Sequence, residues 1–259
     1  MAYASLLDEI MKEFDRHSYV LHGDILPEAK CEKYKKIMTG KAKAIDYAKA
    51  LEFLSHCLKQ YHGKSTIILI DEYDVPLENS YFEGFYDKMI KFIRSLFESA
   101  LKTNDSLEFA IITGCLRISK ESIFTGLNNL NINSILSGSY AEYFGFTEAE
   151  VEQMLKDYAL EEKIAEAKDW YDGYLFGNIE VYNPWSVINY VYTAITNQNP
   201  LPKPYWSNTS SNSIVKDLVE EADEAAREEL EILIQGGTIE KPIHENITYA
   251  DIHESPDNL

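Results

Sequence analysis

The apolar positions of this chain follow a helical period over several long segments. Residues such as Leu6, Ile10 and Phe14 recur every three or four positions, so they would line one face of a helix. The same spacing predicts three further helices in the first half of the chain. The predicted helices of this half are residues 6–14, 28–37, 46–60 and 81–101.

Two short apolar runs flank the last of these helices. They are residues 67–70 and 107–113, and both are rich in branched side chains. An unbroken apolar run of this length is typical of a strand buried on both faces of a parallel sheet. A helix between two such strands predicts a right-handed crossover and parallel pairing. The sequence therefore predicts an α/β fold with flanking helices.

The pattern changes after Thr147, which forms a capping box with Glu150 at the start of a helix. A mainly helical region follows, with one hairpin predicted around the turn Gly177-Asn178 and an Asn183-Pro184 helix start. We predict two domains, an α/β core over residues 1–146 and a helical lid over 147–259. The smaller elements expected are extended pieces at 132–136 and 142–146, the second as a further strand of the sheet, a helix at 161–171, strands at 172–176 and 179–181, helices at 184–195, 211–221 and 225–235, and a ribbon of 238–243 with 246–252.

Charge and composition exclude several classes of protein. The formal net charge is −19, which argues against a surface that binds a nucleic-acid backbone, since such binding depends on Lys and Arg. The three cysteines are scattered, and the six histidines lack the spacing of a metal motif. Neither a membrane-length apolar run nor a secretory leader is found. We expect a cytoplasmic protein without membrane contact.

The candidate chemistry lies where the two predicted strands end. Asp71 and Glu72 follow the first strand, and open α/β sheets bind ligands at the carboxyl ends of their strands. This is a Walker B pattern, in which one carboxylate serves Mg²⁺ and the next activates water. Thr113 closes the second strand as a candidate γ-phosphate sensor, and Arg117 could supply positive charge. The alternative is a solvated acidic turn, a strand-end hydroxyl and a surface arginine.

A triplet upstream resembles a phosphate-binding loop without being one. Gly63-Lys64-Ser65 lacks the glycine that a P-loop places five positions earlier, where this chain has Leu58. A P-loop also lies between a strand and a helix, whereas here a helix precedes and a strand follows. We therefore interpret Gly63 as a helix C-cap.

Several motifs, taken together and in order, resemble the predicted bacterial AAA-ATPase-like family of P-loop NTPases. The resemblance covers about residues 45–255. The motifs are residues 69–77 (LIDEYDVPL), 112–114 with 117–119 (ITG, RIS), 126–129 (GLNN), 144–151 (FGFTEAEV), 170–174 with 176–177 (WYDGY, FG), 181–186 (VYNPWS) and 205–209 (YWSNT).

The resemblance implies an ASCE-type P-loop sheet followed by a helical lid, with Mg²⁺ and ATP as cofactors. It implies that Asp71 serves the metal, Glu72 activates water, and Thr113 with Arg117 completes the site. The family's P-loop, Arg-Arg-Phe-Gly-Lys-Ser, is absent from this sequence, as is the nuclease-like domain that many members carry. We therefore expect a truncated or inactive ATPase.

An alternative of a different class is a non-catalytic interaction module. Its sheet edge, left open where a P-loop strand would lie, would bind a protein partner or a missing N-terminal segment. A nuclease is disfavoured, because Asp71 and Glu72 lack a nearby Glu-x-Lys on a following strand.

Overall fold

The computed structural model describes most of the chain and divides it into two compact units. It describes residues 2–23, 25–115, 123–124, 126–127, 129–197, 201–207, 216, 219–220 and 222–242. Unit 1 comprises residues 1–129 and 217–259, and unit 2 comprises residues 130–216. The domain boundary that the sequence predicts, between residues 146 and 147, stays a prediction.

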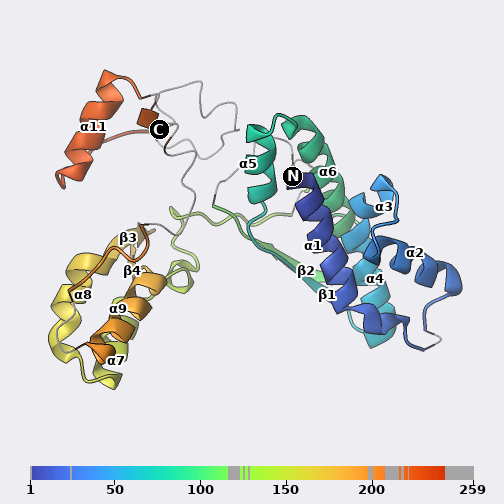
Figure 1. The fold of residues 1–259 in the computed structure, drawn as a ribbon, viewed down its shortest axis with the longest axis horizontal. Helices are drawn as coiled ribbons and strands as arrows, with labels where there is room; N and C mark the ends of the chain where they lie inside the picture. The colour runs from blue at the N-terminus through green and yellow to red at the C-terminus, as the bar shows by residue number, and fades with distance from the viewer. Residues whose placement is uncertain are drawn as a thin grey trace. The chain divides into compact units, whose positions relative to one another are not determined.

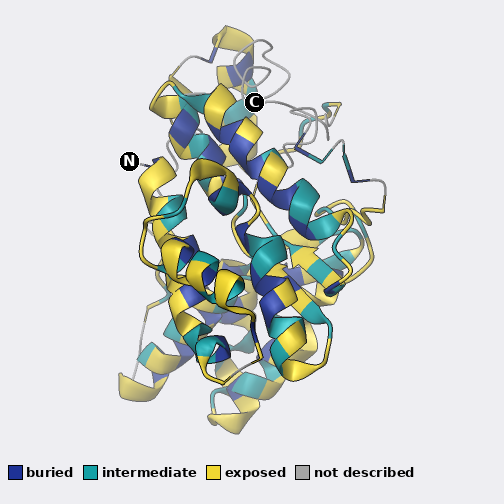
Figure 2. Ribbon diagram, turned by 90° about the vertical axis from the view of Figure 1, so that its right-hand side faces the viewer, coloured by how far each residue is buried: buried dark blue, intermediate teal, exposed yellow. Residues whose placement is uncertain are grey.

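Unit 1 begins with amphipathic helices, each buried along one side and exposed along the other (Figure 2). Two predicted helices are interrupted. Residues 46–60 form two helices that meet at Lys49, and 81–101 is broken at Gly84, whose φ of +76° suits glycine. The elements are α1 (Ala2–Arg16), η1 (Ser18–Leu21), α2 (Glu28–Met38), α3 (Ala44–Ala48), α4 (Ala50–His62), α5 (Val75–Phe82) and α6 (Tyr86–Leu101).

The core of unit 1 joins these helices through large side chains. Phe14 and Tyr34 are both fully buried, with ring centroids 4.7 Å apart, and the Tyr34 hydroxyl donates to the Phe14 carbonyl at 2.8 Å. This bond satisfies a polar group that would otherwise be costly to bury. α6 adds the rest of the apolar face. Its buried residues are Met89, Ile90, Phe92, Ile93, Leu96, Phe97 and Ala100.

Strands β1 (Thr66–Ile70) and β2 (Leu107–Ile112) pair in parallel, as predicted. Their register places Ile70 opposite Ile112, so both strands end at the same level. Helices α4 and α6 lie along this pair (Figure 1) and contact it. The α/β class is thereby confirmed. Two parallel strands establish the α/β class but not the more specific P-loop NTPase fold.

The prediction that both strands are buried on both faces is wrong. Ile68 of β1 is buried, but the alternate residue Leu69 is 71% exposed, and Ile111 opposite it on β2 is 52% exposed. Ile67 and Phe109 lie on this same exposed face. The physical reason is that α4 and α6 cover only one face, and successive strand residues point to opposite faces. The described residues therefore leave an apolar sheet face open.

Unit 2 matches the predicted pattern of helices and one hairpin. Thr147 and Glu150 form the capping box, and Asn183 accepts a hydrogen bond from the Ser186 amide at 2.9 Å. The predicted helix 161–171 is divided into a 3₁₀ turn and α8. The elements are η2 (Ala141–Tyr143), α7 (Glu148–Asp157), η3 (Glu161–Lys163), α8 (Ile164–Tyr171), β3 (Asp172–Phe176), β4 (Ile179–Tyr182) and α9 (Pro184–Thr196).

One strand prediction in unit 2 is wrong. Residues 142–146 do not extend the parallel sheet, because 141–143 is a 3₁₀ turn. Phe146 instead makes an isolated antiparallel bridge to Tyr182 of the hairpin. Gly145 allows this approach, since a Cβ there would lie 2.9 Å from the Tyr182 carbonyl oxygen.

After residue 207 the structure describes only residues 216, 219–220 and 222–242. Helix α11 (Glu224–Ile234) matches the predicted helix 225–235, and the chain turns at Gly236 with a φ of +80°. Most of the predicted helix 211–221 and of the ribbon 238–252 lies outside the described residues. In the part of the chain that the structure describes, none of the helices has the length and apolar character needed to span a bilayer.

Candidate functional site

The carboxyl ends of β1 and β2 bring three of the four predicted site residues together. Asp71 directly follows β1, and Thr113 directly follows β2. The backbone continues the pairing past the strand ends, because the Thr113 amide donates to Ile70 O at 2.9 Å and the Tyr73 amide to Thr113 O at 3.0 Å. Parallel register therefore fixes residues 71 and 113 side by side.

The Thr113 hydroxyl donates a hydrogen bond to Oδ1 of Asp71. The same carboxylate oxygen accepts the Glu72 amide at 3.1 Å. Asp71 and Glu72 are exposed, so both carboxylates can meet a ligand. A carboxylate that accepts two hydrogen bonds holds a fixed orientation. The strand ends thus present one oriented carboxylate, one accessible neighbour and one hydroxyl.

Glu72 has a left-handed backbone conformation, with a φ of +51°. Only glycine adopts this region without a steric penalty. A non-glycine residue held there is uncommon and indicates that the surrounding structure imposes the turn. The turn therefore begins at Glu72, directly after Asp71.

Gly114 lies close to the residues that follow Glu72 in this turn. A Cβ at residue 114 would lie 2.6 Å from the Tyr73 ring and 2.7 Å from Oδ1 of Asp74, which is too close for any other residue. Tyr73 in turn packs edge-on against Phe124 at 5.2 Å. The sequence offers a hint of this role, since a glycine immediately follows a strand-end hydroxyl, but spacing alone does not identify its neighbour.

The electrostatic character of the turn is strongly negative. Partial burial and then the nearby carboxylates, with Asp74 and Glu72 the foremost, raise the pKa of the Cys115 thiol. Asp71 and Glu78 contribute in the same direction. A site with this potential favours a cation. Sequence reasoning missed Cys115 as a marker of it, because Cys115 has no motif around it.

The donor set fits Mg²⁺ better than a transition metal. Among the described residues, no three His, Cys, Asp or Glu side chains come together to hold an ion. Mg²⁺ does not need such a cluster, because it commonly keeps several waters and binds one or two carboxylates together with substrate phosphates. Asp71 is the residue that would hold it. Arg117 lies outside the described residues.

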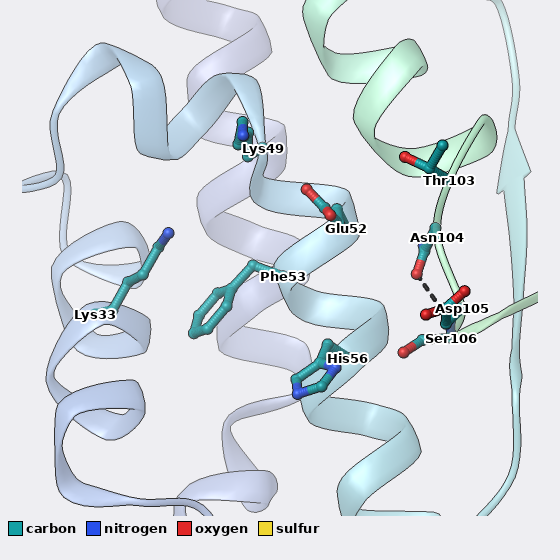
Figure 3. Close-up of a pocket in the computed structure, with 9 residues that line it drawn as sticks. All are labelled: Lys33, Lys49, Glu52, Phe53, His56, Thr103, Asn104, Asp105 and Ser106. Carbon is teal, nitrogen blue, oxygen red and sulfur yellow. Dashed lines mark hydrogen bonds between the residues drawn. The ribbon is translucent and has the colours of Figure 1, made fainter.

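A separate pocket of about 260 Å³ lies at the other end of the strands (Figure 3). Ser106 on its wall directly precedes β2, and the Ser106 amide donates to Oδ1 of Asn104 at 3.0 Å. Lys33 lies over the Phe53 ring at 4.9 Å and pairs with Asp46 at 3.1 Å. The pocket therefore belongs to the amino ends of the strands and is no part of the Asp71 site. It is lined by Lys33, Lys49, Glu52, Phe53, His56, Thr103, Asn104, Asp105 and Ser106.

Comparison with known proteins identifies the family of the segment that carries the site. Residues 9–124 match the family model described as "Predicted AAA-ATPase". This segment belongs to the AAA-ATPase-like family. The AAA-ATPase-like segment contains Asp71, Glu72, Thr113 and Arg117, so the resemblance inferred from the motifs is confirmed there.

A curated relative extends the similarity further along the chain. It is described as "Uncharacterized protein in vnfD 5'region" of Azotobacter chroococcum mcd 1, and it is 30% identical over 169 residues. The match covers 63% of this chain but only 31% of the relative, so this chain spans under a third of that protein's length. No solved structure matches the chain.

Proposed function

We propose that Asp71, Glu72 and Thr113 form the metal- and water-binding part of a nucleotide-hydrolysing site. The observation that carries this proposal is the hydrogen bond from Thr113 to Asp71 across the carboxyl ends of two parallel strands. Ligands of open α/β sheets bind at this edge. The AAA-ATPase-like match of the same segment supports the choice of a nucleotide as ligand.

Each residue has a distinct role in this proposal. Asp71 would hold hydrated Mg²⁺, and the ion would supply positive charge that balances the phosphates. Glu72, which is exposed and adjacent to Asp71, would orient or deprotonate the attacking water. The Thr113 hydroxyl exchanges its bond to Asp71 for one to a phosphate oxygen and so senses the ligand. Arg117 is proposed as a further positive group on resemblance alone.

The sequence printed for this chain holds no P-loop glycine–lysine cradle for the phosphates. Gly63 instead caps α4 with a φ of +66°, and its amide donates to Lys59 O at 2.8 Å. The Gly63-Lys64-Ser65 triplet thus lies after a helix and before β1, where it cannot wrap a phosphate in the P-loop manner. We therefore propose that the chain alone binds Mg–ATP weakly and hydrolyses it slowly or not at all.

Paramagnetic Mn²⁺ tests the metal half of the proposal directly. Mn²⁺ can replace Mg²⁺ at oxygen sites, and it broadens the NMR signals of nearby amides. We expect selective broadening at residues 71–73 and 113–115 in the wild type. Asp71→Asn should remove it. Glu108→Gln, which neutralises an exposed carboxylate at the amino end of β2, is the matched control and should leave it unchanged.

The thermal midpoint with and without millimolar Mg–ATP tests the nucleotide half. A ligand at about 100 times its dissociation constant adds about 2.7 kcal/mol to the free energy of unfolding, so a shift of a few degrees would report tight binding. A shift that Asp71→Ala abolishes would show that this chain holds ATP without a P-loop. In the NMR experiment, Mn²⁺ that broadened amide signals uniformly over the whole acidic surface would contradict the assigned metal site.

The open sheet face favours a second candidate function, a protein-interaction module. Ile67, Leu69, Phe109 and Ile111 form a contiguous apolar patch in the described part of unit 1. A single face of this kind marks an interaction surface more often than a scattered apolar residue does. The proposed occupant is an apolar, uncharged segment of another polypeptide, because the four positions carry no polar group.

Substitution on this patch shows whether the apolar sheet face is open in the isolated protein or covered by another part of the chain. If the face is open in the isolated protein, Leu69→Lys leaves the free energy of unfolding within about 0.5 kcal/mol and lowers binding of an apolar fluorescent dye. Ile68→Lys, which alters the buried face of the same strand, is expected to unfold unit 1. A loss of several kcal/mol in Leu69→Lys would show that the face is covered within the chain, and would remove the interaction proposal.

A further inference from the structure

Four polar side chains in unit 1 form an unbroken hydrogen-bonded line that links α1, η1 and α4. Oε1 of Glu13 lies 3.0 Å from Nε2 of His17. The other ring nitrogen of His17, Nδ1, lies 2.9 Å from the Tyr19 hydroxyl. That hydroxyl lies 3.1 Å from Nε2 of His62, at the end of α4. The proposed nucleotide site uses none of these residues.

The surroundings hold the line in place. The rings of His17, Tyr61 and His62 all pack edge-on against Tyr19, with centroids 5.6, 5.3 and 5.7 Å away. Only 17% of the His17 side chain is exposed, whereas His62 is an exposed residue. One imidazole is therefore sheltered beside a carboxylate, and the other meets solvent.

When both imidazoles are neutral, the three contacts allow one arrangement of protons, because each contact needs one donor and one acceptor. The Glu13 carboxylate only accepts, so His17 donates through Nε2–H. Nδ1 of His17 then accepts from the Tyr19 hydroxyl. The Tyr19 oxygen in turn accepts from Nε2–H of His62. All three contacts are satisfied in this arrangement, with both histidines as the Nε2–H tautomer.

Adding one proton reverses the inner part of the line. A proton from solvent joins Nδ1 of His62, the Nε2 proton of His62 passes to the Tyr19 oxygen, and the Tyr19 proton passes to Nδ1 of His17. His17 becomes an imidazolium facing Glu13, Tyr19 stays neutral, and His62 becomes the neutral Nδ1–H tautomer. A second proton would place two cations on either side of one hydroxyl.

Other charged and titratable groups near the line come from each neighbouring element. Arg16 of α1 lies 3.3 Å from Glu13 and shares its negative charge. Tyr61 of α4 packs on Tyr19. Tyr34 of α2 faces the same group, but its hydroxyl is already engaged with the Phe14 carbonyl. None of these can replace Tyr19 as the bridge between the two imidazoles.

We propose that Glu13, His17, Tyr19 and His62 form a proton relay that carries one proton from solvent at His62 to the His17–Glu13 pair. It is suited to this task because imidazoles are the side chains that change charge near neutral pH.

NMR of the imidazole nitrogens tests the relay on the whole chain. Between about pH 8 and about pH 5, we expect His17 to take up a proton while His62 changes from the Nε2–H to the Nδ1–H tautomer in the same step. In Tyr19→Phe, which keeps the ring but removes the bridge, His62 should lose this change of tautomer. Glu13→Gln should separate the change at His62 from protonation of His17.

His56 is an internal control, because the Lys30 ammonium donates to its Nε2 at 2.6 Å and so keeps it outside the relay. It should hold the Nδ1–H tautomer in every variant while it is neutral. A His62 that keeps one tautomer throughout the wild-type titration would overturn the proposal. The same tautomer change in Tyr19→Phe as in wild type would also overturn it.

Discussion

At the scale of single residues, the left-handed conformation of Glu72 predicts a measurable strain. Glu72→Gly and Glu72→Ala both remove the carboxylate, but only glycine relieves a φ of +51°. We expect the glycine variant to be more stable than the alanine variant by about 1 kcal/mol. Urea unfolding of the two proteins measures the difference. Equal stabilities would show that the turn is not strained.

The sequence alone predicts those parts of unit 1 that depend on local patterns, but not those that depend on contacts between distant residues. Asp71 and Thr113 could be paired in advance, because each follows an apolar run and parallel strands end at one edge. The C-cap at Gly63 could be predicted from its place after a helical stripe. The Glu13–His62 relay could not, because His62 lies 43 residues after Tyr19 and no periodic pattern connects the two.

At the scale of elements, the start of α9 provides a clean test of helix capping. The Asn183 side chain accepts the Ser186 amide at 2.9 Å, and Pro184 occupies the first turn. Asn183→Ala should lower the stability of unit 2 by about 1 kcal/mol. Asn189→Ala in the middle of the same helix is the control and should be neutral or slightly stabilising. Chemical denaturation followed by circular dichroism compares the two.

Buried tyrosines around the β3–β4 hairpin make unit 2 sensitive to alkali. Burial is the main cause that raises the pKa of Tyr171 to about 12 and that of Tyr182 to about 12. A tyrosine in an unfolded chain ionises near about pH 10. The stability that these two buried tyrosines contribute is therefore fully present below about pH 10 and is lost as the pH rises towards their folded-state pKa.

The urea midpoint measured at about pH 9 and about pH 11 checks this dependence. Tyr182→Phe should lose less stability over that interval than the wild type does. Tyr174→Phe replaces an exposed ring of the same hairpin and serves as the control. If Tyr182→Phe and wild type lose equal stability, burial of Tyr182 is not the cause.

Helix existence was predictable and helix interruption was not. The apolar stripes of α1, α2 and α6 are long enough to fix their type. The breaks at Lys49 and around Gly84 depend on how neighbouring helices pack, although the glycine was a sign of the second. Apolar runs also failed to show that β1 is covered on one face only, because a run reports hydrophobicity and not the presence of a covering layer.

At the scale of the whole molecule, charge is distributed unevenly. Residues 1–64 contain 11 basic and 9 acidic residues, a net charge of +2, so a total of −19 leaves −21 on residues 65–259. Like charges repel within a compact fold. We expect the thermal midpoint to rise as salt increases from about 20 mM to about 500 mM, because screening lengths fall below the size of a domain. A falling midpoint would show that attractive pairs dominate.

The parallel pairing of β1 and β2 also bears on how unit 1 folds. Two parallel strands cannot be joined by a tight turn, and here α5 and α6 lie between them in the chain. Contacts between residues far apart in sequence form late, after the entropy of closing the intervening segment is offset. We expect the helices to gain amide-exchange protection first, and the edge that carries Asp71 and Thr113 to be assembled last.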